Sequence, residues 1–121
     1  MWTYHQATGE LFDRSDVHVA TGYAGAPEGK NDPTKQDIPK VGPLPRGRYT
    51  IGSPHDSPHT GPYTMDLTPD PTNEMYGRGD FRMHGDSEEH PGAASEGCIV
   101  MPREVRVRVW ISGDHQLKVV L

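Results

Sequence analysis

The chain has 121 residues, of which 32% are hydrophobic, and a formal net charge of −5. A chain of this length has room for one hydrophobic core, so residues 1–121 are expected to form a single domain. It contains neither a basic stripe with interleaved aromatic residues nor about 20 consecutive apolar residues, so we expect no nucleic-acid partner and no membrane span.

Alternating side chains predict strands in the first half of the chain. Residues 2–12 have the pattern of a hairpin whose turn lies at Thr8-Gly9, and residues 17–23 have the pattern of a third strand. A loop rich in Gly, Pro, Lys and Asp follows at 27–45, and loops of this length in compact domains are usually functional or disordered. Another short strand is expected at 48–51.

The second half is predicted to alternate short strands with polar loops. The strands are expected at 63–67, 80–84, 98–101 and 116–121. The loops are expected at 53–62, 69–79 and 86–95. For residues 102–111 the pattern is ambiguous, because valines at every second position favour a strand, whereas the leading proline and Glu104 favour a helix.

The only cysteine, Cys98, directly follows a glycine, and His84 lies fourteen positions upstream. A Cys/His pair is the minimum apparatus for acyl transfer, because the thiolate is the nucleophile and the imidazole takes the thiol proton. Taken alone, a lone cysteine is more often a buried apolar residue, and a lone histidine is more often structural. The polar lead-in Ser95-Glu96-Gly97 and the histidine at a neighbouring strand end favour the catalytic interpretation.

The arrangement of His84-Gly85 followed by Ser95-Glu96-Gly97-Cys98 resembles the L,D-transpeptidase signature, in which a His-Gly precedes a Ser-His-Gly-Cys. Similarity extends over nearly the whole chain, and the further segments that carry it are Trp2-Thr3-Tyr4, Thr8-Gly9, Gly22-Tyr23-Ala24-Gly25, Gly42–Tyr49, Gly77-Arg78, Phe81–Asp86 and the region of Arg103. Together they look like the small L,D-transpeptidase-related domain of type VI secretion effectors that attack peptidoglycan.

The resemblance implies a small, mainly β domain, a sandwich or barrel with long loops and one short helix, and it favours the helix at 102–111. Two departures from the wider family affect the site. Glu96 stands where that family has histidine, a feature shared by the effector-like branch, and Val100 stands where it has arginine. Arg103 is a candidate for the missing positive charge.

The family also implies a mechanism. Cys98 would attack the carbonyl of the third residue in a peptidoglycan tetrapeptide stem and expel the terminal D-alanine. His84 would either deprotonate the thiol or hold a thiolate–imidazolium pair. The N–H groups of Gly97 and Cys98 would bind the oxyanion. Attack on the thioester by water gives L,D-carboxypeptidase activity, and attack by an amine gives transpeptidation or exchange of D-amino acids. No cofactor or metal is implied.

A substrate that carries carboxylates needs cations nearby. Three arginines are candidates for this role, with ordinary surface solvation as the alternative: Arg78, Arg82 and Arg103.

Three further residues have two open interpretations each. Asp86 is a candidate to orient the imidazole or contact substrate, or else begins a turn. Ser95 braces His84 or shapes its loop. Tyr23 lines the groove or packs against neighbouring residues.

The rival chemistry is a zinc hydrolase built from the histidines and their acidic neighbours, such as His55-Asp56 with His59. No recognisable zinc-ligand spacing supports it. A non-catalytic wall-binding module is the other alternative.

The expected partners are the peptidoglycan stem peptide, a cognate immunity protein and a component of the secretion machine. The N-terminus shows no basic segment followed by an apolar one, so we expect synthesis in the cytoplasm without a signal peptide. By resemblance, the domain would act in the periplasm of a target cell.

Overall fold

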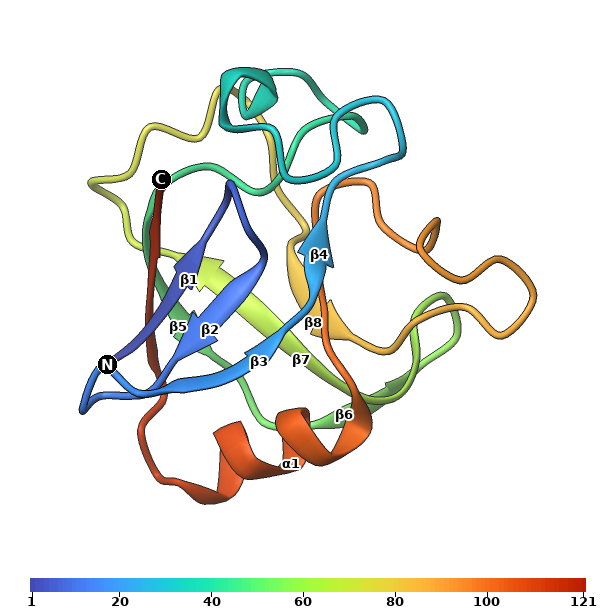
Figure 1. Cartoon of the computed structure of the whole chain (residues 1–121). Coiled ribbons are helices and arrows are strands. Elements are labelled where there is room, and N and C mark those ends of the chain that lie inside the picture. Colours follow the sequence, from blue (N-terminus) through green and yellow to red (C-terminus); the bar gives the residue numbers. More distant parts are fainter.

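The computed structural model describes all residues from 1 to 121 (Figure 1). Short strands dominate it, together with one 3₁₀-helix, η1 (Pro33–Lys35), and one α-helix, α1 (Arg103–Ile111). The strands are β1 (Trp2–His5), β2 (Glu10–Phe12), β3 (His18–Thr21), β4 (Tyr23–Ala24), β5 (Gly47–Ile51), β6 (His55–Ser57), β7 (Gly61–Pro69), β8 (Arg82–His84), β9 (Ile99–Val100) and β10 (Gln116–Val120). The predicted mainly β fold with one short helix is confirmed.

The strands form one continuous path in the order β3-β2-β1-β10-β5-β7-β8-β9-β4, and β6 pairs with β7 beside it. β3 and β4 stand at opposite ends of this path, although Gly22 alone separates them in the chain. The sheet therefore curls until its two ends lie together, which gives the barrel-like shape seen in Figure 1. A side chain at position 22 would collide with the Val100 carbonyl oxygen, so this close junction requires glycine.

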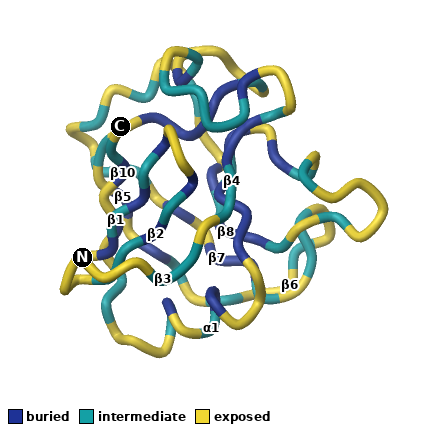
Figure 2. The backbone as a smooth tube through the Cα atoms, in the orientation of Figure 1, coloured by how far each residue is buried: buried dark blue, intermediate teal, exposed yellow.

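Side chains alternate between the two faces of each strand, and those on the inner face fill the interior of the barrel. Many of the buried segments, dark blue in Figure 2, lie there. The buried apolar side chains from the strands include Trp2, Tyr4, Leu11, Tyr49, Ile51, Met65, Leu67, Met83, Ile99, Leu117 and Val119. The long connecting segments carry many of the exposed and intermediate residues, and they extend outward from the barrel (Figures 1 and 2).

Residues 102–111 are helical from Arg103 onward. Val105 and Val109, four positions apart, are buried against the sheet, whereas Ile111 is exposed. This i, i+4 pattern places both valines on one face of a helix. The period-2 pattern of this segment is therefore coincidental. The structure has no helix with the length and apolar character needed to cross a bilayer.

Several predicted boundaries were wrong. The segment 53–62, predicted as loop, contains β6, which pairs with β7 at the side of the sheet, and β7 begins at Gly61 rather than at Tyr63. Polar residues between prolines carry no strand signal, so pairing with a neighbour decided this element. The strand predicted at 17–23 is divided at Gly22, and the loop at 27–45 contains η1. The hairpin at 2–12 is confirmed.

Candidate active site

Core residues and site residues alternate along β8, and a site residue directly precedes β9. These strands are parallel, and Met83 pairs with Ile99, both fully buried in the core. Successive side chains of a strand point to opposite faces, so Arg82 and His84 lie on the outer face of β8. Cys98, one residue before β9, joins them there, because the backbone N–H of Arg82 donates to its Sγ at 3.3 Å. The register pairs His84 with Val100, two residues after Cys98, and the predicted nucleophile and base line the same pocket.

Cys98 and His84 both line a pocket of about 670 Å³. Its walls come from segments far apart in the chain: the loop after η1, the β6–β7 turn and the segments before β8 and β9. The lining residues are Pro39, Lys40, His59, Thr60, Gly77, Arg78, Gly79, Asp80, Phe81, Arg82, His84, Ala93, Ala94, Ser95, Glu96 and Cys98. The pocket therefore presents the thiol and the imidazole to a ligand together with several charged groups.

The His84 ring is almost fully buried, and its Nδ1 lies 2.8 Å from the Gly85 carbonyl oxygen. A carbonyl only accepts hydrogen bonds, so Nδ1 carries the proton and Nε2 of the neutral ring keeps its lone pair. Burial lowers the pKa of His84, and the positive charges of Arg106 and Arg82 lower it further. His84 is therefore a neutral imidazole at neutral pH and is suited to accept a proton.

Cys98 is also held in its neutral form. Its Sγ lies 3.8 Å from the Asp80 carbonyl oxygen, to which the thiol donates. Burial raises the pKa of Cys98, and this effect outweighs the opposing effects of the Arg82 N–H and of the two arginine charges nearby. A neutral thiol and a neutral imidazole in one pocket favour deprotonation by His84 during attack over a resting thiolate–imidazolium pair.

The alkylation of Cys98 tests this resting state. Iodoacetamide should react with the folded protein more slowly at pH 7 than with free cysteine, because only the thiolate is nucleophilic. The rate should rise with pH to values above the ordinary thiol pKa, and His84→Ala should change it little. Mass spectrometry of the alkylated protein gives the rate, with the urea-unfolded chain as the reactive control. Rapid alkylation at pH 7 that depends on His84 would indicate an ion pair instead.

Ser95 holds the loop that leads to Cys98. Its buried hydroxyl oxygen accepts from the backbone N–H groups of Gly25 and Gly97, at 2.9 and 3.0 Å, and its hydroxyl donates to the Cys98 carbonyl at 2.7 Å. Ser95 therefore shapes the loop and makes no hydrogen bond to His84. The N–H of Gly97 is already used in this contact, whereas the Cys98 N–H donates to no acceptor within the chain.

Gly97→Ala should destabilise the fold and remove the site geometry. Gly97 has φ of +144°, and a Cβ there would lie 2.7 Å from Nη2 of Arg78 and 2.8 Å from the Phe81 ring. Strained backbone of this kind costs about 1–3 kcal/mol before any clash is counted. Urea unfolding should show a lower midpoint. Gly79→Ala is the matched control, because a Cβ there meets nothing within 4 Å; equal midpoints for the two variants would contradict this account.

Arg78 acts as a clamp between two walls of the pocket. Its guanidinium donates to the carbonyl oxygens of Gln36, Gly42 and Pro43 on one side, and to that of Glu96 on the other, at 2.7–3.2 Å. It also lies over the Phe81 ring. These contacts use both terminal amino groups, so the structure places Arg78 at the pocket as a support of its walls.

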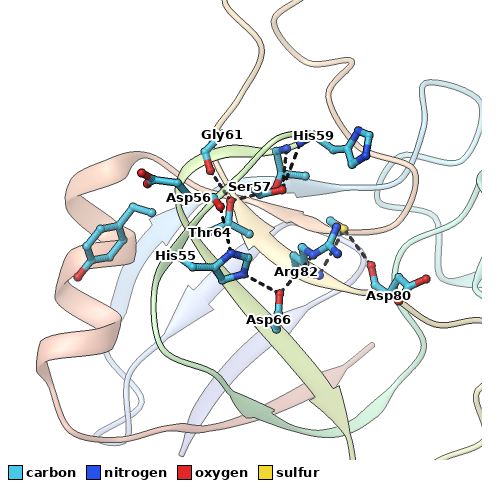
Figure 3. A network of polar contacts seen from close by, with 12 residues as sticks. His55, Asp56, Ser57, His59, Gly61, Thr64, Asp66, Asp80 and Arg82 are labelled. Carbon is cyan, nitrogen blue, oxygen red and sulfur yellow. Dashed lines mark hydrogen bonds and ion pairs between the residues drawn. The ribbon is translucent and has the colours of Figure 1, made fainter.

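Arg82 belongs to the polar network of Figure 3. Its Nε donates to Oδ1 of Asp66 at 3.2 Å, and the same oxygen lies 3.1 Å from Nε2 of His55. Asp66 raises the pKa of His55, and His55 in turn lowers the pKa of Asp66. The network extends across β6, β7 and β8 to the thiol of Cys98, since the Arg82 N–H donates to Sγ.

Asp86 and Tyr23 order the loop beside the pocket. The Tyr23 hydroxyl donates to Oδ1 of Asp86 at 2.6 Å and accepts from the Ala94 N–H, and burial with this acidic neighbour raises the pKa of Tyr23 to about 12. Asp86 also accepts from the N–H groups of Ser87 and Gly92. Neither residue lines the pocket, and Asp86 makes no hydrogen bond to the His84 ring.

Arg103 lies away from the pocket, at the start of α1, with its guanidinium over the Tyr63 ring. Sequence reasoning missed Arg106, which is buried and donates to the carbonyls of Met101, Pro62 and Tyr63. It borders Gly85, where a Cβ would lie 2.9 Å from its Nη2. No local pattern distinguishes Arg106 from the exposed arginines of the same helix.

Lys40 and His59 also line the pocket without having been predicted there. Lys40 comes from the long loop predicted at 27–45, and His59, considered above only as a zinc ligand, comes from the short turn between β6 and β7. For the zinc alternative, three or four ligands would have to converge, and no group of three or more His, Cys, Asp or Glu side chains is arranged to hold a metal ion.

Comparison with known proteins identifies a family for this chain. No curated protein and no solved structure gives a significant match. Residues 18–121 match the Tlde1 domain, which covers the pocket, the Cys98 loop and every strand from β3 onward. The chain therefore belongs to the Tlde1 domain family, a family of type VI secretion effector domains.

Proposed function

We propose that this effector domain is a cysteine acyl-transfer enzyme that acts on peptidoglycan stem peptides. The observation that carries the proposal is the placement of Cys98 and His84 on the same face of adjacent parallel strands, in one pocket. The motif around both residues resembles that of L,D-transpeptidases, and the family match supports a secreted effector. The proposed substrate is the tetrapeptide stem, from which the enzyme removes the terminal D-alanine.

In the first step the Cys98 thiol turns away from the Asp80 carbonyl, and its proton moves to Nε2 of His84 as Sγ attacks the carbonyl carbon of the third stem residue. The C–N bond to D-alanine then breaks, and the imidazolium returns the proton to the leaving amine. The Nδ1–H contact with the Gly85 carbonyl supports this role, because it orients the ring and stabilises the imidazolium that forms transiently.

The unpaired Cys98 N–H is the available donor to the oxyanion that forms in this step. For the Gly97 N–H to assist, its bond to Ser95 would first have to break. In the second step a water gives a proton to Nε2 while its oxygen attacks the thioester, the C–S bond breaks, and Sγ takes the proton back. An amine that replaces this water yields a D-amino acid exchange or cross-linked product.

The proposed location of the reaction is the periplasm of a target cell, where stem peptides occur. A cognate immunity protein and a component of the secretion machine are the proposed protein partners, in keeping with the effector family.

Mass spectrometry of purified tetrapeptide muropeptide, incubated with the protein, tests the reaction. Loss of one alanine with the wild type and none with Cys98→Ala is the expected result. Added D-methionine that appears in the product would show exchange as well. An intact tetrapeptide after incubation with folded wild-type protein would overturn the enzymatic proposal and favour a wall-binding module.

A further inference from the structure

The guanidinium of Arg82 is fixed by one hydrogen bond, and its two terminal amino groups have no partner in the protein. Its Nε is bound to Asp66 on the neighbouring strand, where the two residues are paired in the sheet register. Its Nη1 and Nη2 donate to no atom of the protein, and its side chain lines the pocket and is 31% exposed. Arg82 is thus anchored at one edge of the guanidinium, and two amino groups remain available to a ligand.

The position of Arg82 relative to the nucleophile limits what these amino groups can bind. The backbone N–H of Arg82 contacts Sγ of Cys98, and its charge lowers the pKa values of both Cys98 and His84. Arg82 and Cys98 also line the same pocket, so a group bound by this guanidinium is held in the pocket that contains the proposed nucleophile. In a tetrapeptide, the carboxyl carbon of the terminal residue is three bonds from the scissile carbonyl carbon, or roughly 3–4 Å.

The other cations are less suited to this carboxylate. Both terminal amino groups of Arg78 are used by backbone carbonyls, and Arg103 lies outside the pocket. Lys40 is exposed at the edge of the pocket and offers a flexible ammonium rather than a planar fork. A guanidinium binds a carboxylate through two parallel hydrogen bonds, which adds orientation to charge attraction.

We propose that Arg82 binds the free carboxylate of the leaving D-amino acid, and that Asp66 is a positioning residue that aims the guanidinium. His55, on the other side of Asp66, completes the support (Figure 3). This inference rests on the proposed function and makes it more specific: the substrate must end in a free carboxylate directly after the scissile bond. The resulting preference is for exopeptidase cleavage of tetrapeptides over cleavage within a longer chain.

Two substrates test the inference: a tetrapeptide with a free C-terminal carboxylate and the same peptide with a C-terminal amide. For the wild type, kcat/KM should be about 10- to 100-fold higher for the acid, as expected for one charge-assisted bidentate contact. Arg82→Gln should bring this ratio close to one, and Asp66→Asn should lower it partway. A change in the reactivity of Cys98 affects both substrates equally, so it cancels in the ratio of the two kcat/KM values.

Arg108→Gln is the matched control, because Arg108 forms an exposed pair with Asp13 and does not line the pocket. It should keep the wild-type ratio. A ratio near one for the wild type, or an unchanged ratio in Arg82→Gln, would overturn the inference even if the enzyme cleaves both peptides.

Calorimetric binding to Cys98→Ala separates this inference from the proposed function. If wild-type protein cleaves neither peptide, the proposed reaction is wrong, but binding of a carboxylate at Arg82 can still be measured. Tighter binding of the acid than of the amide to Cys98→Ala, with the difference lost in Cys98→Ala/Arg82→Gln, would support the site. Equal binding of both peptides would overturn it.

Discussion

Cys98→Ala is expected to abolish release of D-alanine from the tetrapeptide, and His84→Ala to slow it by about 100- to 10,000-fold. The first variant removes the atom that forms the thioester. The second removes the proposed proton acceptor and leaves the thiol neutral, because burial raises the pKa of Cys98. Steady-state kinetics of alanine release would show the loss in kcat. A His84→Ala variant with wild-type kcat would contradict the general-base role.

The pH dependence of kcat/KM gives an independent test of the same pair. The pKa of His84 is below its ordinary value of about 6.5, so the imidazole stays in its basic form to lower pH. Activity should therefore fall only as the pH drops below the ordinary histidine range. The raised pKa of Cys98 moves the alkaline limit of the kcat/KM profile to higher pH, so the pH range of full activity becomes wider. An acid limb centred above 6.5 would instead indicate a stabilised imidazolium.

Arg78→Met is expected to destabilise the protein by about 2–4 kcal/mol and to remove most of its activity. The substitution leaves four backbone carbonyls without their donor, and each unpaired group costs on the order of 1–3 kcal/mol when buried, less where water can reach it. The walls that carry Lys40 and Cys98 are then no longer joined. Urea unfolding and the alanine-release assay measure the two effects.

Arg78→Lys separates charge from geometry in this clamp. A single ammonium keeps the charge but cannot reproduce the planar set of donors, so we expect nearly the same loss as for Arg78→Met. Arg48→Met is the control, because Arg48 is exposed on β5 and lies outside the pocket. It should shift stability by no more than about 0.5 kcal/mol. If Arg78→Lys retained wild-type stability and activity, only the charge of Arg78 would matter.

The mainly β character was predictable because its signal is local, and the proposal of Cys98 and His84 as the reactive pair rests on a local signal as well. Alternation at period 2 marks a strand irrespective of its partners, and Cys98 and His84 stand in a short motif with characteristic neighbours. The helix at 103–111 had competing local signals. Burial of Val105 and Val109 against the sheet resolved them.

The tertiary structure decided the roles of the charged residues. Arg78, Arg82 and Arg103 look alike in the sequence, yet one binds backbone carbonyls, one is anchored by Asp66, and one lies over the Tyr63 ring. Every residue has a backbone carbonyl, so no sequence pattern marks the carbonyls that Arg78 binds. Strand pairing joins positions far apart in the chain, so no local pattern marks Asp66 as the partner of Arg82. The sequence alone points to Cys98 and His84 as the proposed nucleophile and base; which cation is free to meet a substrate follows only from how the sheet and its loops close around them.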